Sequence, residues 1–133
     1  MILVDTSAWV EYDRATGSPV DTRLTSLIES GGESIVVTEP VLMEVVAGAR
    51  DEKRHEDLRR LLTAFRWLPF DPVADFEGAA RVYRACRSAG VTPRGLIDCM
   101  ITNVAIRTGS SLLAVDRDYA DIATVLPLQL AGS

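Results

Sequence analysis

Four acidic residues stand alone in apolar surroundings, and they are the side chains of this sequence best suited to chemistry. Asp5 ends the run Ile2-Leu3-Val4, and Asp116 follows a second apolar run near the other end of the chain. Glu44 and Asp98 are each the only charge within a helix-like apolar stretch. Because an unpartnered buried carboxylate is costly, four such positions predict one cluster assembled from distant segments. Oxygen ligands favour Mg²⁺ or Mn²⁺ over zinc in such a cluster.

The chemistry most compatible with this cluster is metal-assisted hydrolysis of a phosphodiester. A bound divalent ion lowers the pKa of a water and absorbs charge on the phosphate. The sequence has a single histidine, His55, in a charged segment, and it contains no P-loop, G-x-G-x-x-G or G-x-S-x-G motif. Asp5 has an alternative interpretation as a turn residue or helix cap. Asp118 could instead be the N-cap of a short C-terminal helix, and Asp121 a solvated surface residue.

Thr6 and Ser7 directly follow the first acid of the cluster. Either of them offers an N-cap for a short helix that reaches about Asp13, and we expect capping to be their main role. A hydroxyl two residues after a metal-binding aspartate could also orient the carboxylate or a bound water. They are therefore accessory candidates beside the acids.

Strand-like and helix-like segments alternate along the chain, which predicts an α/β fold with a mainly parallel central sheet. The expected strands are 2–5, 35–38 and 111–115, with 67–70 at a sheet edge because Pro69 cannot donate to a ladder. The expected helices are 6–13, 21–29, 39–48, 51–65, 75–89, 96–108 and 118–124. We expect a three-layer α/β/α sandwich forming a single domain over residues 1–133. Ligands of such sheets bind at the carboxyl ends of the strands, where Asp5 and Asp116 are placed.

Length and composition are those of an ordinary globular domain. The chain has 133 residues, 47% of them hydrophobic and 25% charged, which argues against disorder. Cys86 and Cys99 form no C-x-x-C pair and are expected to be reduced. Met1 runs directly into the first strand, and no apolar run approaches the ~20 residues of a membrane span. These observations predict a cytoplasmic protein without a membrane segment.

The charge balance neither supports nor excludes a nucleic-acid partner. The net charge is −5, whereas phosphate binding needs a cationic surface. Acids that hold a metal are neutralised by it, however, and residues 50–66 are rich in cations. The candidate RNA contacts are Arg94, in the loop before residues 96–108, and Arg50 and Arg54 in the basic segment. Their alternative interpretation is ordinary surface charge on solvated helix faces.

Four short motifs in this order resemble the PIN domain and, within it, the VapC toxins of bacterial VapBC toxin–antitoxin pairs. They are Asp5-Thr6-Ser7 after the first strand, Glu44 within residues 38–44, Gly95-Leu96-Ile97-Asp98, and Leu112-Leu113-x-x-Asp116-x-Asp118-Tyr119. The resemblance covers essentially the whole chain and implies a Mg²⁺- or Mn²⁺-dependent endoribonuclease that inhibits translation by cutting structured RNA, often tRNA. It further implies a homodimer neutralised by a small VapB-like antitoxin whose C-terminal segment covers the site.

Carried over residue by residue, the resemblance makes Asp5, Glu44, Asp98 and Asp116 the acidic quartet. Asp5, Asp98, Asp116 and Asp118 would be the metal ligands, with Asp118 an accessory acid and Thr6 or Ser7 the hydroxyl after the first aspartate. Ala114 stands where many relatives have Thr or Ser, which removes a hydroxyl that would support the fourth acid. Asn103 occupies a position that is usually small and apolar. Neither departure removes an acid of the quartet.

Other classes of protein fit the residues less well. A non-catalytic acidic α/β domain of regulatory or partner-binding type, such as a receiver, would carry its phosphoacceptor at the end of a middle strand and a lysine near the C-terminus. Here the strand 35–38 ends without an aspartate, and the only lysine is Lys53. A phosphatase built on Asp116-x-Asp118 would need more chain after that motif. A PIN domain that only binds a partner would not need the intact quartet.

Overall fold

The computed structural model describes residues 1–115 and 117–132, and its sheet consists of four short strands in the order β3-β2-β1-β4. The strands are β1 (Ile2–Val4), β2 (Ile35–Val37), β3 (Arg66–Trp67) and β4 (Ser111–Leu113). All three neighbouring pairs are parallel. The edge position expected for the strand near Pro69 is correct, although β3 is shorter than the expected segment and begins one residue earlier.

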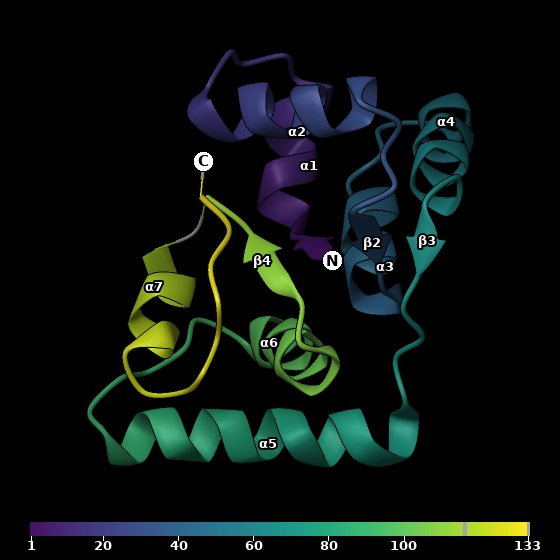
Figure 1. Ribbon diagram of the computed structural model, residues 1–133. Helices are drawn as coiled ribbons and strands as arrows, with labels where there is room; N and C mark the ends of the chain where they lie inside the picture. Colours follow the sequence, from purple (N-terminus) through teal and green to yellow (C-terminus); the bar gives the residue numbers. More distant parts are fainter. Residues whose placement is uncertain (116, 133) are drawn as a thin grey trace.

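Seven helices flank this sheet within the described residues. They are α1 (Thr6–Asp13), α2 (Pro19–Glu29), α3 (Glu39–Ala47), α4 (Glu52–Thr63), α5 (Pro72–Ser88), α6 (Leu96–Thr108) and α7 (Arg117–Ala123). Figure 1 shows α1 and α2 on one side of the sheet and α5 and α6 on the other. The α/β fold with a parallel central sheet and helices on both sides is therefore confirmed. No helix among these residues is long and apolar enough to cross a membrane.

The starts of two helices differ from the expected boundaries. Helix α2 begins at Pro19 and α5 at Pro72, earlier than the apolar periodicity predicts. In both helices a proline occupies the first turn, where its missing N–H and fixed φ cost nothing. The side chain of the residue before each proline, Ser18 or Asp71, accepts backbone N–H groups as the N-cap. Capping chemistry, and not hydrophobic periodicity, sets these starts.

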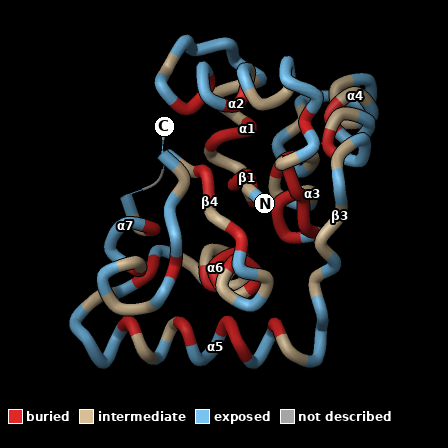
Figure 2. Tube along the Cα trace, in the orientation of Figure 1, coloured by how far each residue is buried: buried red, intermediate tan, exposed pale blue. Residues whose placement is uncertain are grey.

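Strands β1, β2 and β4 are largely buried, which is why they are apolar runs in the sequence, whereas the edge strand β3 is partly exposed. Leu3 and Val4 in β1 and Leu112 and Leu113 in β4 have no exposed surface, and neither has any residue of β2. Figure 2 shows the same pattern, with buried segments along the strands and on the helix faces turned toward them. Strand ends anchored in such a core are fixed in space, and side chains placed there are held with them.

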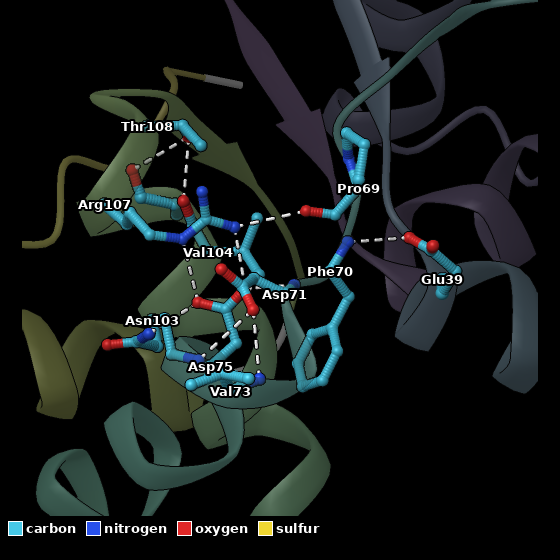
Figure 3. A network of polar contacts seen from close by, with 12 residues as sticks. Glu39, Pro69, Phe70, Asp71, Val73, Asp75, Asn103, Val104, Arg107 and Thr108 are labelled. Carbon is cyan, nitrogen blue, oxygen red and sulfur yellow. Dashed lines mark hydrogen bonds and ion pairs between the residues drawn. The ribbon is translucent and has the colours of Figure 1, made fainter.

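A buried polar network joins α5 to α6 (Figure 3). The carboxylate of Asp75 is fully buried and accepts Arg107 Nε at 2.9 Å, Arg107 Nη2 at 2.7 Å and Asn103 Nδ2 at 2.8 Å. It also accepts the backbone N–H of Asp71 at 2.7 Å. Burial raises the pKa of Asp75, but the hydrogen bonds from Arg107, Asp71 and Asn103 outweigh it, and the pKa lies below its usual value. Asn103, unusual for its position, thus satisfies a buried charge.

The two helices of this network approach closely at Gly78. A Cβ atom on Gly78 would lie 2.2 Å from Asn103 Nδ2 and 2.4 Å from Asn103 Cγ. Asn103 could avoid that contact only by leaving its hydrogen bond with Asp75. Gly78 and Asn103 are therefore a matched pair across the interface between α5 and α6.

We expect Gly78→Ala to destabilise the protein by about 1–3 kcal/mol, the usual cost of overpacking, although alanine favours a helix. In an Asn103→Ala background Gly78→Ala should destabilise the protein much less, because the side chain that the new methyl group would contact is absent. Urea unfolding of the four proteins of this double-mutant cycle measures the coupling. Additive effects of the two substitutions would contradict the close approach.

Candidate active site

Asp5 follows β1 directly and is held by three donors. Its Oδ2 accepts the backbone N–H of Ser7 at 3.0 Å and the Ser7 hydroxyl at 2.6 Å. Its Oδ1 accepts the hydroxyl of Tyr119 at 2.8 Å, and only 4% of the residue is exposed. The alternative interpretation of Asp5 as a helix cap is confirmed, and the expectation that Thr6 or Ser7 caps α1 is wrong. Asp5 is the N-cap, because its backbone is extended and its carboxylate accepts the N–H of Ser7 in the first turn.

Asp98 meets Asp5 at the same hydroxyl. It lies in the first turn of α6, which begins after Gly95, and its Oδ1 is 3.2 Å from the Tyr119 oxygen. Two acids from opposite parts of the chain therefore share one buried donor. The unpaired N–H groups at a helix start favour negative charge there, and this applies to Asp5 at the N-cap of α1 and to Asp98 in the first turn of α6.

Glu44 is tied to the same region through Thr6. The Thr6 hydroxyl donates to Glu44 Oε1 at 2.7 Å across the gap between α1 and α3. Burial raises the pKa of Glu44 above its usual value, the Thr6 hydrogen bond lowers it, and the negative charge of Asp5 raises it further. Asp5 and Glu44 are therefore close enough for the charge of one to act on the other. Such a carboxyl holds a proton to higher pH than an exposed glutamate does.

The segment around the fourth acid is described on both sides but not at Asp116, which lies outside the described residues. Before it, the backbone N–H of Val115 donates to the Ser7 hydroxyl at 3.0 Å. Ser7 therefore supplies a hydroxyl that supports this segment, whereas Ala114 has none. After it, α7 begins at Arg117, so the interpretation of Asp118 as the N-cap is wrong. Asp118 lies in the first turn of α7, with its Oδ2 at 3.4 Å from Arg94 Nε.

The donor set at this edge consists of oxygens, as Mg²⁺ or Mn²⁺ requires. Among residues 1–115 and 117–132, no three His, Cys, Asp or Glu side chains are close enough together to hold a metal ion. The pair of Asp5 and Asp98 still suits a hard cation, because the Tyr119 hydroxyl brings an oxygen of each to one point. Cys99 is an unsuitable ligand, since burial, with Cys86 and Asp98 nearby, raises the pKa of its thiol to about 11.

The three candidate RNA contacts all border the acids. Arg50 and Arg54 line a cavity of about 510 Å³ that also includes Glu44 and Trp9, and Arg54 forms an ion pair with Asp13. Arg94 lines a second cavity, of about 460 Å³, and reaches from it to Asp118. Cationic side chains thus stand on two sides of the acidic region, although the chain as a whole is acidic.

Tyr119 is the site residue that sequence reasoning missed. It appears in the motif Asp116-x-Asp118-Tyr119 only as an aromatic residue, and burial of its ring is what helix periodicity suggests. In the structure it is 1% exposed, with its hydroxyl on Asp5 and Asp98. The available signal was a tyrosine at a buried position beside a strand-end acid, because a buried phenol hydroxyl needs a polar partner.

Comparison with known proteins identifies the class of this fold and site. The family model of the PIN domain matches residues 2–125. Ribonuclease VapC11 of Mycobacterium tuberculosis is 44% identical over 132 residues, which are 99% of this chain and 98% of that protein. VapBC2 from Rickettsia felis, solved with a DNA fragment from its promoter, matches with a TM-score of 0.74 and 17% identity over 98% of each chain. VapC20 of M. tuberculosis, described as a sarcin-ricin loop cleaving toxin, has a TM-score of 0.68 and 18% identity over 97% of this chain and 99% of its own.

The chain therefore belongs to the PIN domain family, as its motifs predicted. Its identity with VapC11 over nearly the full length of both proteins places it more narrowly among the VapC ribonucleases.

Proposed function

We propose that this protein hydrolyses phosphodiester bonds of structured RNA, with tRNA as the first class to test, and so inhibits translation as the toxin of a VapBC pair. The proposal treats the whole chain as one PIN domain that works with its RNA in the cytoplasm. The observation that carries the proposal is that Asp5 and Asp98 both accept the buried hydroxyl of Tyr119. Glu44 lies near enough for the charge of Asp5 to raise its pKa. Kinship with the VapC ribonucleases supports the reaction type.

In the proposed site, Asp5, Asp98 and Asp116 hold a divalent ion, Mg²⁺ or Mn²⁺, with Asp118 as an accessory acid. Such an ion lowers the pKa of a water and absorbs negative charge on the phosphate. The donors of Ser7 and Tyr119 keep the Asp5 carboxylate from rotating. Arg94 stands beside Asp118, where its guanidinium can bind a phosphate of the RNA strand.

Glu44 has the role of moving a proton in this scheme. Its Oε1 accepts the Thr6 hydroxyl, and among the described residues no hydrogen bond is made to Oε2, so we assign Oε2 as the atom that receives the proton of the attacking water. The water oxygen bonds to phosphorus, the bridging P–O bond breaks, and the leaving oxygen takes up a proton from solvent water. A carboxyl whose pKa is raised is better matched to proton transfer near neutral pH than an ordinary glutamate is.

We expect Asp98→Asn to reduce RNA cleavage by more than about 100-fold, because the neutral amide weakens the ligand set. Purified protein with Mn²⁺ or Mg²⁺ and a total tRNA pool, read by sequencing of RNA ends, measures this. Asp121→Asn is the matched control, because it makes the same chemical change at an exposed position of α7 and should leave cleavage intact. Undiminished cleavage by Asp98→Asn, with wild-type cleavage that persists in EDTA, would refute the metal site. A wild-type protein that binds RNA without cutting it would favour a non-catalytic binding domain.

Arg94 offers a test of where the RNA lies. We expect Arg94→Gln to raise KM several-fold and to lower the salt slope of RNA binding by about 1, the value for one phosphate contact. Binding of uncleaved RNA to Asp98→Asn protein, with and without Arg94→Gln, measures that slope. The control Arg23→Gln removes an exposed arginine of α2 that lines neither cavity. Equal slopes for all these proteins would remove Arg94 from the interface.

The antitoxin partner fits the cavity beside Glu44. That cavity combines apolar side chains, among them Trp9, Val45 and Leu58, with Arg50 and Arg54. A segment that carries apolar and acidic side chains would fill it and would deny RNA both arginines. We therefore assign this cavity to a VapB-like antitoxin. The tRNA cleavage assay tests such a partner, because adding it should suppress cleavage.

We also propose a homodimer, formed through an apolar patch at the start of α5. Val73 and Phe76 are exposed at 80% and 53%, and Phe70 packs edge-on against Phe76. The backbone N–H of Phe70 donates to Glu39 in the first turn of α3, which holds the segment that carries Phe70. Large apolar side chains gathered at one exposed place are typical of an association surface.

We expect wild-type protein to have a dimer mass in light scattering after gel filtration, and Phe76→Glu to have a monomer mass at the same concentration. Burying an unpaired carboxylate in an apolar interface is costly enough to prevent association. Leu130→Glu, at an apolar side chain that is 44% exposed, is the control and should remain dimeric. A monomeric wild type, or a dimeric Phe76→Glu, would exclude this interface.

A further inference from the structure

Tyr119 places a single hydroxyl between two carboxylates in the interior of the protein. The residue is 1% exposed, and its oxygen lies 2.8 Å from Asp5 Oδ1 and 3.2 Å from Asp98 Oδ1. The ring alone would pack equally well as phenylalanine, since burial of the ring requires no hydroxyl. The hydroxyl therefore has a function that packing does not explain, and its two partners are the acids of the proposed metal site.

Counting lone pairs shows which oxygen of Asp5 can take a further ligand. A carboxylate oxygen accepts about two hydrogen bonds. Oδ2 of Asp5 already accepts both donors of Ser7, whereas Oδ1 accepts only Tyr119 among the described residues. The position left for a cation is thus on Oδ1, the oxygen that the Tyr119 hydroxyl holds. Rotation of the carboxylate would break three hydrogen bonds at once.

The same hydroxyl also contacts Asp98, which lies in the first turn of α6. A phenol hydroxyl has one proton, so the shorter contact to Asp5 is the primary bond and the 3.2 Å contact to Asp98 is shared or secondary. Burial, together with the charges of Asp5 and Asp98, raises the pKa of Tyr119 far above its usual value. The phenol is therefore a donor at all physiological pH values and not a phenolate ligand.

We propose that Tyr119 is a positioning residue, whose hydroxyl holds Asp5 Oδ1 and Asp98 Oδ1 in the arrangement that receives the divalent ion. This inference rests on the metal dependence proposed above. The hydroxyl stays bonded when the ion is present, because Oδ1 of Asp5 has a second lone pair that the ion can use. In the opposite arrangement, the hydroxyl would occupy the place of the cation and leave when the ion binds. The two arrangements predict opposite effects on metal affinity when the hydroxyl is removed.

The test is the affinity of the purified, RNA-free protein for Mn²⁺, measured by calorimetry and by the electron paramagnetic resonance of free Mn²⁺. Tyr119→Phe should weaken Mn²⁺ binding by about 10- to 100-fold, the usual effect of losing a partner behind a ligand. In the cleavage assay this variant should need correspondingly more Mn²⁺, and it should recover most of its rate when Mn²⁺ is saturating. A purely structural role would instead lower the rate at every Mn²⁺ concentration.

Tyr12→Phe is the matched control, since it removes the hydroxyl of a half-buried tyrosine whose ring packs against Trp9. It should bind Mn²⁺ as wild type does. Circular dichroism and the thermal midpoint without metal show whether Tyr119→Phe is folded, and an unfolded variant would mean that the hydroxyl serves folding, against the proposal. Equal or tighter Mn²⁺ binding by folded Tyr119→Phe would overturn it in favour of a hydroxyl that competes with the ion. A wild type that cleaves RNA but binds no Mn²⁺ would overturn the metal assignment and this inference with it.

Discussion

Repulsion between carboxylates held at one edge of a buried sheet is the constraint on which this structure depends. Asp5 is almost fully buried, and Asp98 reaches the same hydroxyl. Like charges in a low-dielectric interior cannot stay together without donors that stabilise them. The protein supplies those donors from separate elements, namely Ser7 of α1 and Tyr119 of α7, together with the unpaired N–H groups at the starts of α1 and α6. Without these donors nothing would offset the repulsion between the two carboxylates.

The scaffold behind the acids explains how such an arrangement is kept. Strand β1 lies between β2 and β4 in the sheet, so Asp5 extends from a buried strand that is paired on both sides. Helix α6, which carries Asp98, is joined to α5 by the buried carboxylate of Asp75 and its bonds to Asn103 and Arg107. This second charge cluster lies toward the far end of α6 from Asp98. It fixes the helix by charge-assisted hydrogen bonds, where apolar packing alone would allow sliding.

Particular residues show how far sequence reasoning reaches. The strand that ends before Asp5 and the helix from 96 to 108 follow from apolar patterns, because burial depends on local periodicity. Capping depends on backbone turns that the pattern does not contain, so the pattern offers Asp5, Thr6 and Ser7 as caps of α1, and only the structure shows that Asp5 is the cap. Asn103 departs from the small apolar residue that the resemblance implies at its position, and its partner Asp75, which explains it, lies on another helix. Tyr119 was indistinguishable from a core aromatic for the same reason.

The sequence by itself determined the chemical inventory and the class of this protein. The isolated acids, their order and the alternation of strands and helices indicate a PIN domain of the VapC type, because they depend on residue types and on spacing along the chain. Only the tertiary structure decided which donors face which acids. It placed Tyr119 between Asp5 and Asp98, Thr6 on Glu44, Arg94 beside Asp118 and Ser7 beneath Val115. The physical reason is that hydrogen bonds act over about 3 Å, and only folding brings residues so far apart in sequence within that distance.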